Sequence, residues 1–182
     1  QYCEEIQQNT ANIMEKVGES GKANIIYSVG EDGLNVLARG SFHTEILDKI
    51  TNNLAVVDDI SSKGTGNPVD MEQIILWDPD IIIFAPGGAY SQVSSDPTWQ
   101  ELKAIKNNQY YEVPCGPYNW MGNPPSVNRY IGMIWITQLL YPEVAQYDLF
   151  EETVRYYDLF YHSDLTKEQY EDLVKNSILD SK

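Results

Sequence analysis

The pentapeptide PGGAY, residues 86–90, directly follows the apolar run DPDIIIFA and contains two glycines that could cradle a phosphate. A phosphate-binding loop would need the Lys-Ser/Thr ending of a Walker motif or the three-glycine spacing of a dinucleotide fingerprint. The segment PGGAYS has neither feature. We therefore expect Gly87 and Gly88 to turn the chain away from the floor of a ligand cleft rather than to bind a phosphate.

Other side chains that could act in catalysis or bind a metal lack suitable partners. His43 is followed by Glu45 only two positions later, whereas metal ligands on one helix face are three or four residues apart. His162 lies in the C-terminal tail without a recognisable partner, and Cys3 and Cys115 resemble neither a metal motif nor a disulfide framework. We therefore expect two free thiols, no catalytic residue, no metal site and no cofactor.

Aromatic and polar side chains suited to ligand binding are instead found on predicted loops, at Tyr90, Tyr118, Asn119 and Trp120. A tryptophan in the Pro- and Gly-rich segment PCGPYNWMGNPP can lay a flat face against a bulky ligand. An equally compatible interpretation is that Trp120 plugs the end of the core. Arg39 precedes an expected helix N-terminus, where it could assist the binding of an anion, and a solvated arginine is the alternative.

Four apolar segments are expected to form the strands that position these loops, at residues 23–28, 54–57, 81–85 and 110–113. Strands and helices alternate along the chain. This order predicts an α/β three-layer sandwich around a mostly parallel central sheet of about four strands, followed by a helical C-terminal tail. Ligands of such sheets bind outside the carboxyl ends of the strands. The loops expected there are residues 29–39, 58–68, 86–95 and 114–125.

Two of the expected helices have one apolar face that would be directed to the core. The helix over residues 41–50 would bury Phe42, Ile46, Leu47 and Ile50. The helix over residues 126–140 would bury Val127, Ile131, Ile134 and Leu139. Capping boxes are expected at three further helix starts, with the pairs Asp70 and Gln73, Asp148 and Glu151, and Thr166 and Gln169.

The composition limits the possible partners and the number of domains. With 182 residues, of which 42 % are hydrophobic, the chain can bury a full core, and one globular domain is the default. A formal net charge of -15 would repel a nucleic-acid backbone and an anionic membrane surface, so we expect no nucleic-acid partner. The chain begins with Gln1 inside an amphipathic helix, which indicates a fragment without its N-terminal part and without any targeting signal.

The segment VDMEQIILWDPDIII, residues 69–83, resembles the substrate-binding proteins of the importers for iron-siderophore complexes, haem and cobalamin. The likeness continues through WQELKAIKNNQYYEVP, PPSVNRYIGMIW and LLYPEVAQYDLFEETVRYYDLFY, in the order expected for the C-terminal lobe. The resemblance implies that residues 1–22 are part of the helix that links two lobes and that residues 23–182 form the C-terminal substrate-binding lobe. It also implies that the N-terminal lobe is missing.

The same resemblance implies an extracytoplasmic protein, periplasmic or lipid-anchored at the cell surface, that delivers its cargo to the permease of an ABC importer. In that family a glutamate in each lobe docks onto arginines of the permease, and Glu72 stands at the matching position. The expected cargo is an iron-siderophore or a related chelate, for example of iron(III).

Three alternatives remain open from the sequence. Within the same family the cargo could be molybdate or tungstate, or it could be cobalamin. A flavodoxin-like enzyme domain that binds a flavin or a nucleotide is the alternative of another class. The first expected strand-to-helix loop, VGEDGLNVLARG, lacks the Ser/Thr-rich phosphate-binding run of a flavodoxin, which favours the binding protein.

Overall fold

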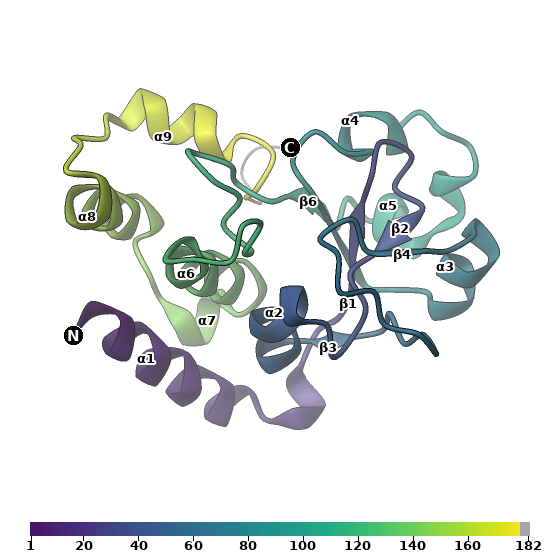
Figure 1. Ribbon diagram of the computed structural model, residues 1–182, viewed down its shortest axis with the longest axis horizontal. Coiled ribbons are helices and arrows are strands. Elements are labelled where there is room, and N and C mark those ends of the chain that lie inside the picture. The colour runs from purple at the N-terminus through teal and green to yellow at the C-terminus, as the bar shows by residue number, and fades with distance from the viewer. Residues whose placement is uncertain (179–182) are drawn as a thin grey trace. The chain divides into compact units, whose positions relative to one another are not determined.

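The structure is a computed structural model that describes residues 1–178, and its chain divides into two compact units (Figure 1). The sheet unit runs from Ala23 to Val113, and the helical unit combines Gln1–Lys22 with residues 114–178. The change of unit between Lys22 and Ala23 lies where the sequence predicts the end of the linker helix. The assignment of residues 1–22 to a linker helix and of residues 23–182 to a substrate-binding lobe stays a prediction.

The sheet unit is built on a mixed sheet with the strand order β4-β2-β1-β5-β6, in which β3 also pairs with β1. The strands are β1 (Asn24–Val29), β2 (Asn35–Val36), β3 (Asn52–Asn53), β4 (Asn67–Pro68), β5 (Ile81–Phe84) and β6 (Tyr110–Glu112). β1 pairs in parallel with β3 and β5, and β5 pairs in parallel with β6. The prediction of an α/β fold with a mostly parallel central sheet is therefore confirmed. The sheet has six strands rather than about four, because the short strands β2 and β4 add antiparallel pairs at one edge.

The strand predicted at residues 54–57 is displaced toward the N-terminus. Sheet pairing in this segment is confined to Asn52 and Asn53. The amide of Leu54 still donates to the carbonyl of Ile25, but the amide of Val56 donates back to the carbonyl of Leu54 at 2.8 Å. The chain thus turns away from the sheet inside the apolar run.

Strand β5 is buried on both faces, as the continuous apolar run predicts. Ile82, Ile83 and Phe84 have no exposed surface. On one face, Ile82 and Phe84 pack in a cluster with Ile74 and Trp99, and the rings of Phe84 and Trp99 lie 5.5 Å apart. The helices and 3-10 turns of this unit are η2 (Phe42–Thr44), α2 (Glu45–Ile50), α3 (Met71–Trp77), α4 (Tyr90–Val93), η3 (Trp99–Glu101) and α5 (Lys103–Lys106).

The helix predicted over residues 41–50 buries its apolar face only in part. Ile46, Leu47 and Ile50 are buried as expected, whereas Phe42 is 61 % exposed, so its predicted inward position is wrong. Phe42 belongs to the 3-10 turn η2, which precedes α2. A 3-10 turn advances by about 120° per residue instead of about 100°, so Phe42 does not align with Ile46 as it would in a continuous α-helix.

The helical unit is arranged around α6, which contacts α1, α7 and α8 (Figure 1). Its helices are α1 (Tyr2–Val17), η1 (Glu19–Gly21), α6 (Asn128–Leu140), α7 (Pro142–Ala145), α8 (Leu149–Tyr161) and α9 (Lys167–Val174). The predicted helix is present, but its amphipathic character is not, because every residue from 131 to 137 is buried. Val127 and Leu139, expected on the inner face, are only half-buried. Neighbouring helices and the loop that contains Trp120 therefore cover α6 on most of its circumference.

Side-chain caps form at the three predicted helix starts, and the complete capping box is present at α9. The carboxylate of Asp70 accepts the amide of Gln73 at 2.8 Å at the start of α3. Asp148 caps α8 in the same way, and Thr166 forms a complete capping box at the start of α9. Each cap satisfies helix amides that have no partner within the helix.

A charged cluster attaches α1 to α8. The guanidinium of Arg155 donates to both carboxylate oxygens of Glu5, at 2.8 and 2.7 Å, and lies 4.9 Å from the centre of the Tyr2 ring. Burial raises the pKa of the neighbouring Glu152, against the opposing effect of Arg155. The bidentate pair orients the N-terminal helix on the helical unit.

The contact between α6 and residue 120 generates a prediction about stability. A Cβ atom on Gly132 would lie 2.1 Å from the carbonyl oxygen of Trp120, so helix and loop meet backbone to backbone. We expect Gly132→Ala to lower the free energy of unfolding by about 3 kcal/mol, because neither backbone can move aside cheaply. Urea unfolding would measure this loss.

Gly21→Ala is the matched control, since its Cβ would meet only the terminal Cγ1 of Val17, at 3.1 Å. We expect the control to change stability by less than about 1 kcal/mol. Equal effects of the two substitutions would contradict the close approach at Gly132.

Candidate functional site

The two glycines that follow β5 form a turn whose amides are already bonded within the protein. Gly87 has a φ of +70°, a conformation that favours glycine, and its amide donates to Oε1 of Glu112 at 2.9 Å. The amide of Gly88 donates to the carbonyl of Ala85 at 3.0 Å. A phosphate bound here would have to displace these acceptors and approach the carboxylate of Glu112. The geometry therefore favours the turn that the sequence predicts at this position.

Tyr90, which begins α4, packs its ring on the core of the sheet unit. The centre of its ring lies 5.4 Å from that of Tyr110 and 6.5 Å from that of Phe84. Burial is the main cause that raises the pKa of its hydroxyl, so Tyr90 is a neutral phenol at physiological pH. It lies directly after Gly87 and Gly88 in the loop at the carboxyl end of β5.

Arg39 is exposed but is not a freely mobile arginine. Its Nε donates to the carbonyl of Asn53 at 2.5 Å, and its Nη2 donates to Oδ1 of Asn52 at 2.6 Å. Its own amide donates to the carbonyl of Ala55 at 2.8 Å. These bonds hold a positive charge at a defined place beside the segment that follows β3.

Three exposed apolar side chains lie in the segment that contains Arg39 or in the segment that follows β3. Phe42 is 61 %, Val56 60 % and Ile60 48 % exposed. The segments meet closely, because a Cβ on Gly40 would lie 3.3 Å from Cδ1 of Ile60. We call Arg39, Phe42, Val56 and Ile60 the Arg39 surface.

Of these four residues, only Arg39 is predicted from the sequence as a candidate ligand-binding residue. Phe42 is predicted on the buried face of a helix and Val56 in a strand. The sequence does contain one signal for an exposed apolar side chain in this region. Ile60 is a single apolar residue within the polar run DDISS.

The remaining predicted ligand residues, Tyr118, Asn119 and Trp120, lie in the helical unit. The side chain of Tyr118 is 50 % exposed. Asn119 is buried, and its Oδ1 accepts the amide of Met121 at 2.7 Å, while its carbonyl accepts the amide group of Asn128. Asn119 thus stabilises the loop itself.

Trp120 has no exposed surface in the structure. Its indole N–H has no hydrogen-bond partner among the described residues. Burial on every side favours the interpretation of Trp120 as a core plug over that of an exposed stacking platform, and a ligand contact of this ring stays a prediction.

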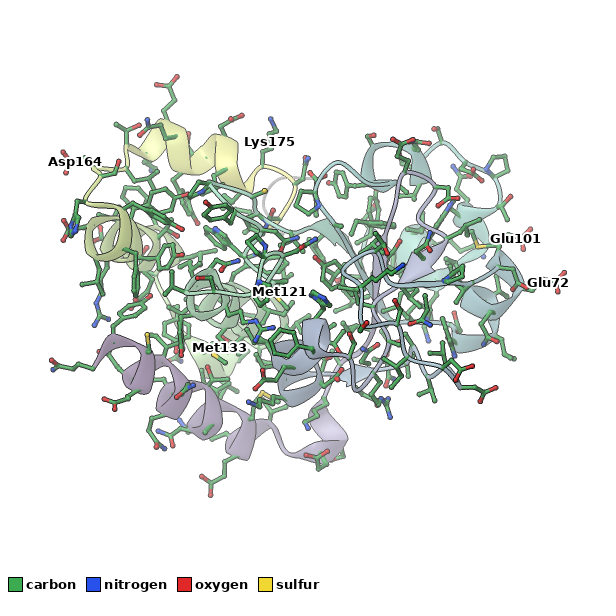
Figure 2. All side chains as sticks on the ribbon, viewed as in Figure 1. Glu72, Glu101, Met121, Met133, Asp164 and Lys175 are labelled. Atoms are coloured by element: carbon green, nitrogen blue, oxygen red, sulfur yellow. The ribbon has the colours of Figure 1, made fainter. Side chains whose placement is uncertain are left out.

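Glu72 is exposed in the first turn of α3, next to the cap formed by Asp70. Figure 2 shows its side chain directed outward from the sheet unit. On the same short helix, Ile75 is 39 % and Leu76 78 % exposed. The sequence prediction for this helix includes Glu72 but not these two neighbours.

The described residues contain no group of three or more His, Cys, Asp or Glu side chains arranged to hold a metal ion. The structure contains pockets in the helical unit, and one of about 300 Å³ is lined by residues of α6, α7, α8 and α9. None of the predicted ligand residues lines that pocket. Within residues 1–178 we also find no helix with the length and apolar character needed to cross a membrane.

The comparisons with known proteins define the class of this fold. The sequence model of the periplasmic binding protein family matches residues 1–115. The chain therefore belongs to the periplasmic binding protein family. Among curated proteins, none matches the chain.

Two solved structures of solute-binding proteins are similar to this chain over most of its length. An ABC transporter solute-binding protein from Sulfurospirillum deleyianum is 34 % identical, with a TM-score of 0.82 over 96 % of this chain and 53 % of its own. A periplasmic solute-binding protein from Veillonella parvula is 27 % identical, with a TM-score of 0.76 over 94 % of this chain and 53 % of its own.

A molybdate periplasmic binding protein from Haemophilus influenzae is 19 % identical, with a TM-score of 0.73 over 91 % of this chain and 50 % of its own, and this similarity shows the fold alone. The chain spans about half the length of these structures. The family consists of solute-binding proteins, so the prediction of a binding module rather than an enzyme is confirmed.

The burial of Trp120 leads to a testable comparison. We expect Trp120→Ala to lower the free energy of unfolding by about 3 to 5 kcal/mol, because it removes a fully buried aromatic side chain. Tyr118→Ala is the control from the same loop, and we expect it to cost less than about 1 kcal/mol, since half of that side chain is exposed. Denaturant unfolding followed by circular dichroism would measure both. A Trp120→Ala variant as stable as the parent would contradict the core interpretation.

Proposed function

We propose that the whole protein is the substrate-binding component of an ABC importer, which captures an iron-siderophore or a related metal chelate outside the cytoplasm. It would act in the periplasm or anchored by a lipid at the cell surface. The observation that carries this proposal is the 34 % identity to an ABC transporter solute-binding protein over 96 % of the chain. Because that relative is about twice as long, we further propose that an N-terminal lobe completes the binding site.

A chelate fits the sheet unit better than a bare oxyanion does. Molybdate or tungstate would need several convergent N–H donors that are not already satisfied. The amides of Gly87 and Gly88 have acceptors within the protein, and Arg39 already donates to Asn52 and Asn53. These features favour a cargo that is recognised mainly through its surface.

The Arg39 surface has the properties that such a cargo requires. Phe42, Val56 and Ile60 offer apolar area for the organic periphery of a siderophore. The guanidinium of Arg39, held in place beside them, can attract the negative charge that many ferric chelates carry. We therefore propose that the Arg39 surface contacts the cargo.

The test is a titration of the intact two-lobed protein with four probes: a ferric tris-hydroxamate, a ferric tris-catecholate, cobalamin and molybdate. We expect one of the ferric chelates to bind most tightly. Phe42→Ala should weaken that binding about tenfold, a typical loss for an aromatic contact, and should change stability by less than about 0.5 kcal/mol because the ring is largely exposed.

Leu159→Ala is the matched control for this titration, since it removes an exposed apolar side chain of α8, in the helical unit. It should leave chelate affinity unchanged. Tightest binding of molybdate or cobalamin would reject the proposed cargo, and unchanged chelate binding by Phe42→Ala would remove Phe42 from the cargo surface.

We also propose that Glu72 docks onto a cationic group of the membrane permease. Glu72→Lys in the intact protein should abolish transport into reconstituted vesicles and leave cargo affinity unchanged. The charge reversal places a cation near a helix N-terminus, which costs only about 0.3 to 1 kcal/mol at an exposed site, so unfolding would not explain a loss of transport. Opposite a permease cation, the same change replaces attraction by repulsion. Normal transport by the Lys variant would exclude Glu72 from the docking surface.

A further inference from the structure

The contact between α1 and α8 buries polar atoms that have no hydrogen bond. Oε2 of Glu152, on α8, is buried without a hydrogen-bond partner among residues 1–178. The same is true of the hydroxyl of Tyr2, on α1, whose ring centre lies 5.5 Å from that of Phe160. Because both atoms lack a partner, they do not bond to each other. A buried polar atom left in this way costs free energy, and the cost is largest when the atom is charged.

The guanidinium of Arg155 does not supply the missing hydrogen bond, because it is committed to another carboxylate. Its two terminal nitrogens donate to both oxygens of Glu5, at 2.8 and 2.7 Å. Nη1 of Arg155 lies 3.6 Å from Oε2 of Glu152, which is too long for a hydrogen bond. An ionised Glu152 therefore has a buried oxygen without a donor, whereas a protonated Glu152 is neutral and avoids most of this cost.

The charges around Glu152 act in both directions. Burial is the largest cause that raises the pKa of Glu152, and the carboxylates of Glu5 and Asp148 raise it further. Arg155 lowers the pKa, but the upward causes prevail. The charges on α1 and on α8 with its cap therefore agree with the missing donor, since both favour the protonated acid.

Glu152 is also placed to exchange a proton with water, since its side chain is 23 % exposed although Oε2 is buried. Its other titratable neighbours are the phenols of Tyr2 and Tyr147. Burial, and then the charge of Glu152, raises the pKa of both hydroxyls, so both phenols are neutral at physiological pH. They add no charge to the cluster in the range in which a carboxylic acid titrates.

We propose that Glu152 is a proton-binding site that controls how firmly α1 is attached to α8. The helix is held firmly while Glu152 carries a proton, and it detaches more often once Glu152 is ionised. This inference goes beyond the proposed function and does not depend on it. Residues 1–22 are predicted to link two lobes, so a change in the attachment of α1 would also change how that link is held.

The direction of the pH dependence follows from linkage. The pKa of Glu152 is raised in the fold, so its contribution to stability is fully present below the pKa of an unfolded glutamate, about 4.3, and is lost as the pH rises through the raised pKa. Glu5 behaves in the opposite way, because the hydrogen bond from Arg155 lowers its pKa. Its ion pair is retained above the same value of about 4.3. At higher pH only Glu152, of these two glutamates, changes its charge.

The test is amide hydrogen exchange of α1 in the intact protein at about pH 5 and about pH 8, on either side of the expected titration, with each rate corrected for the intrinsic effect of pH. We expect residues 2–17 to be severalfold better protected at the lower pH. Glu152→Gln has the shape of the neutral acid and cannot ionise. It should protect α1 equally at both pH values, and better than the parent does at the higher one.

Glu151→Gln is the matched control, because it neutralises the neighbouring carboxylate of α8, which is exposed. It should keep the pH dependence of the parent. A second measurement needs no variant. Titration of the parent followed by carbon-13 NMR of the glutamate carboxyl groups, assigned through the backbone of α8, should show Glu152 titrating at a higher pH than Glu151.

Two outcomes would overturn this inference. If the carboxyl of Glu152 titrates together with that of Glu151, Glu152 is not a proton site with a raised pKa. If the protection of α1 depends on pH to the same extent in the parent and in Glu152→Gln, another group controls the helix. Neither measurement involves the cargo or the permease, so the proposed importer function stands or fails separately.

Discussion

The parallel pairing of β1 with β5 and of β5 with β6 is the constraint on which the rest of the sheet unit depends. The registered pairs from Ile25 and Ile81 to Ser28 and Phe84 bring the carboxyl ends of β1 and β5 to one edge of the sheet. Parallel strands cannot be joined by short hairpins, so the chain must cross over through helices. The turn at Gly87 and Gly88 follows from this arrangement, because the chain must leave β5 at that same edge.

Burial of the strands also determines which apolar residues remain for surface contacts. Ile82, Ile83 and Phe84 are removed from water on both faces of β5, and Ile74 completes one side of this core. Phe42 and Leu76 lie outside this core and are largely exposed. Phe42 belongs to the Arg39 surface, for which we propose a contact with the cargo.

Several charged side chains of the sheet unit are held by contacts within the fold. Acidic groups such as Glu112 and Asp70 accept backbone amides, and Lys103 neutralises two aspartates, so these charges are committed to the fold. Arg39 and Glu72 are a cation and an anion at the surface of the same unit. Side-chain hydrogen bonds hold the guanidinium of Arg39 in place, and Glu72 lies in the first turn of a capped helix.

The sequence by itself determined the features that depend on local patterns. The buried strands at residues 23–28 and 81–85, the caps at Asp70, Asp148 and Thr166, the mostly parallel sheet and the family are all readable from it. Capping is a hydrogen bond between residues three positions apart, and a buried strand is a continuous apolar run, so neighbouring residues carry the information.

Only the tertiary structure decided which apolar residues are covered. Residues 54–57 have the composition of a strand, yet the chain leaves the sheet at Leu54 because Val56 bonds back to it. Helix α6 is enclosed by other helices, and Trp120 is buried, although a Pro- and Gly-rich loop contains it. The Arg39 surface could not be predicted for the same reason. Exposure depends on packing between segments far apart in the sequence, which no local pattern records.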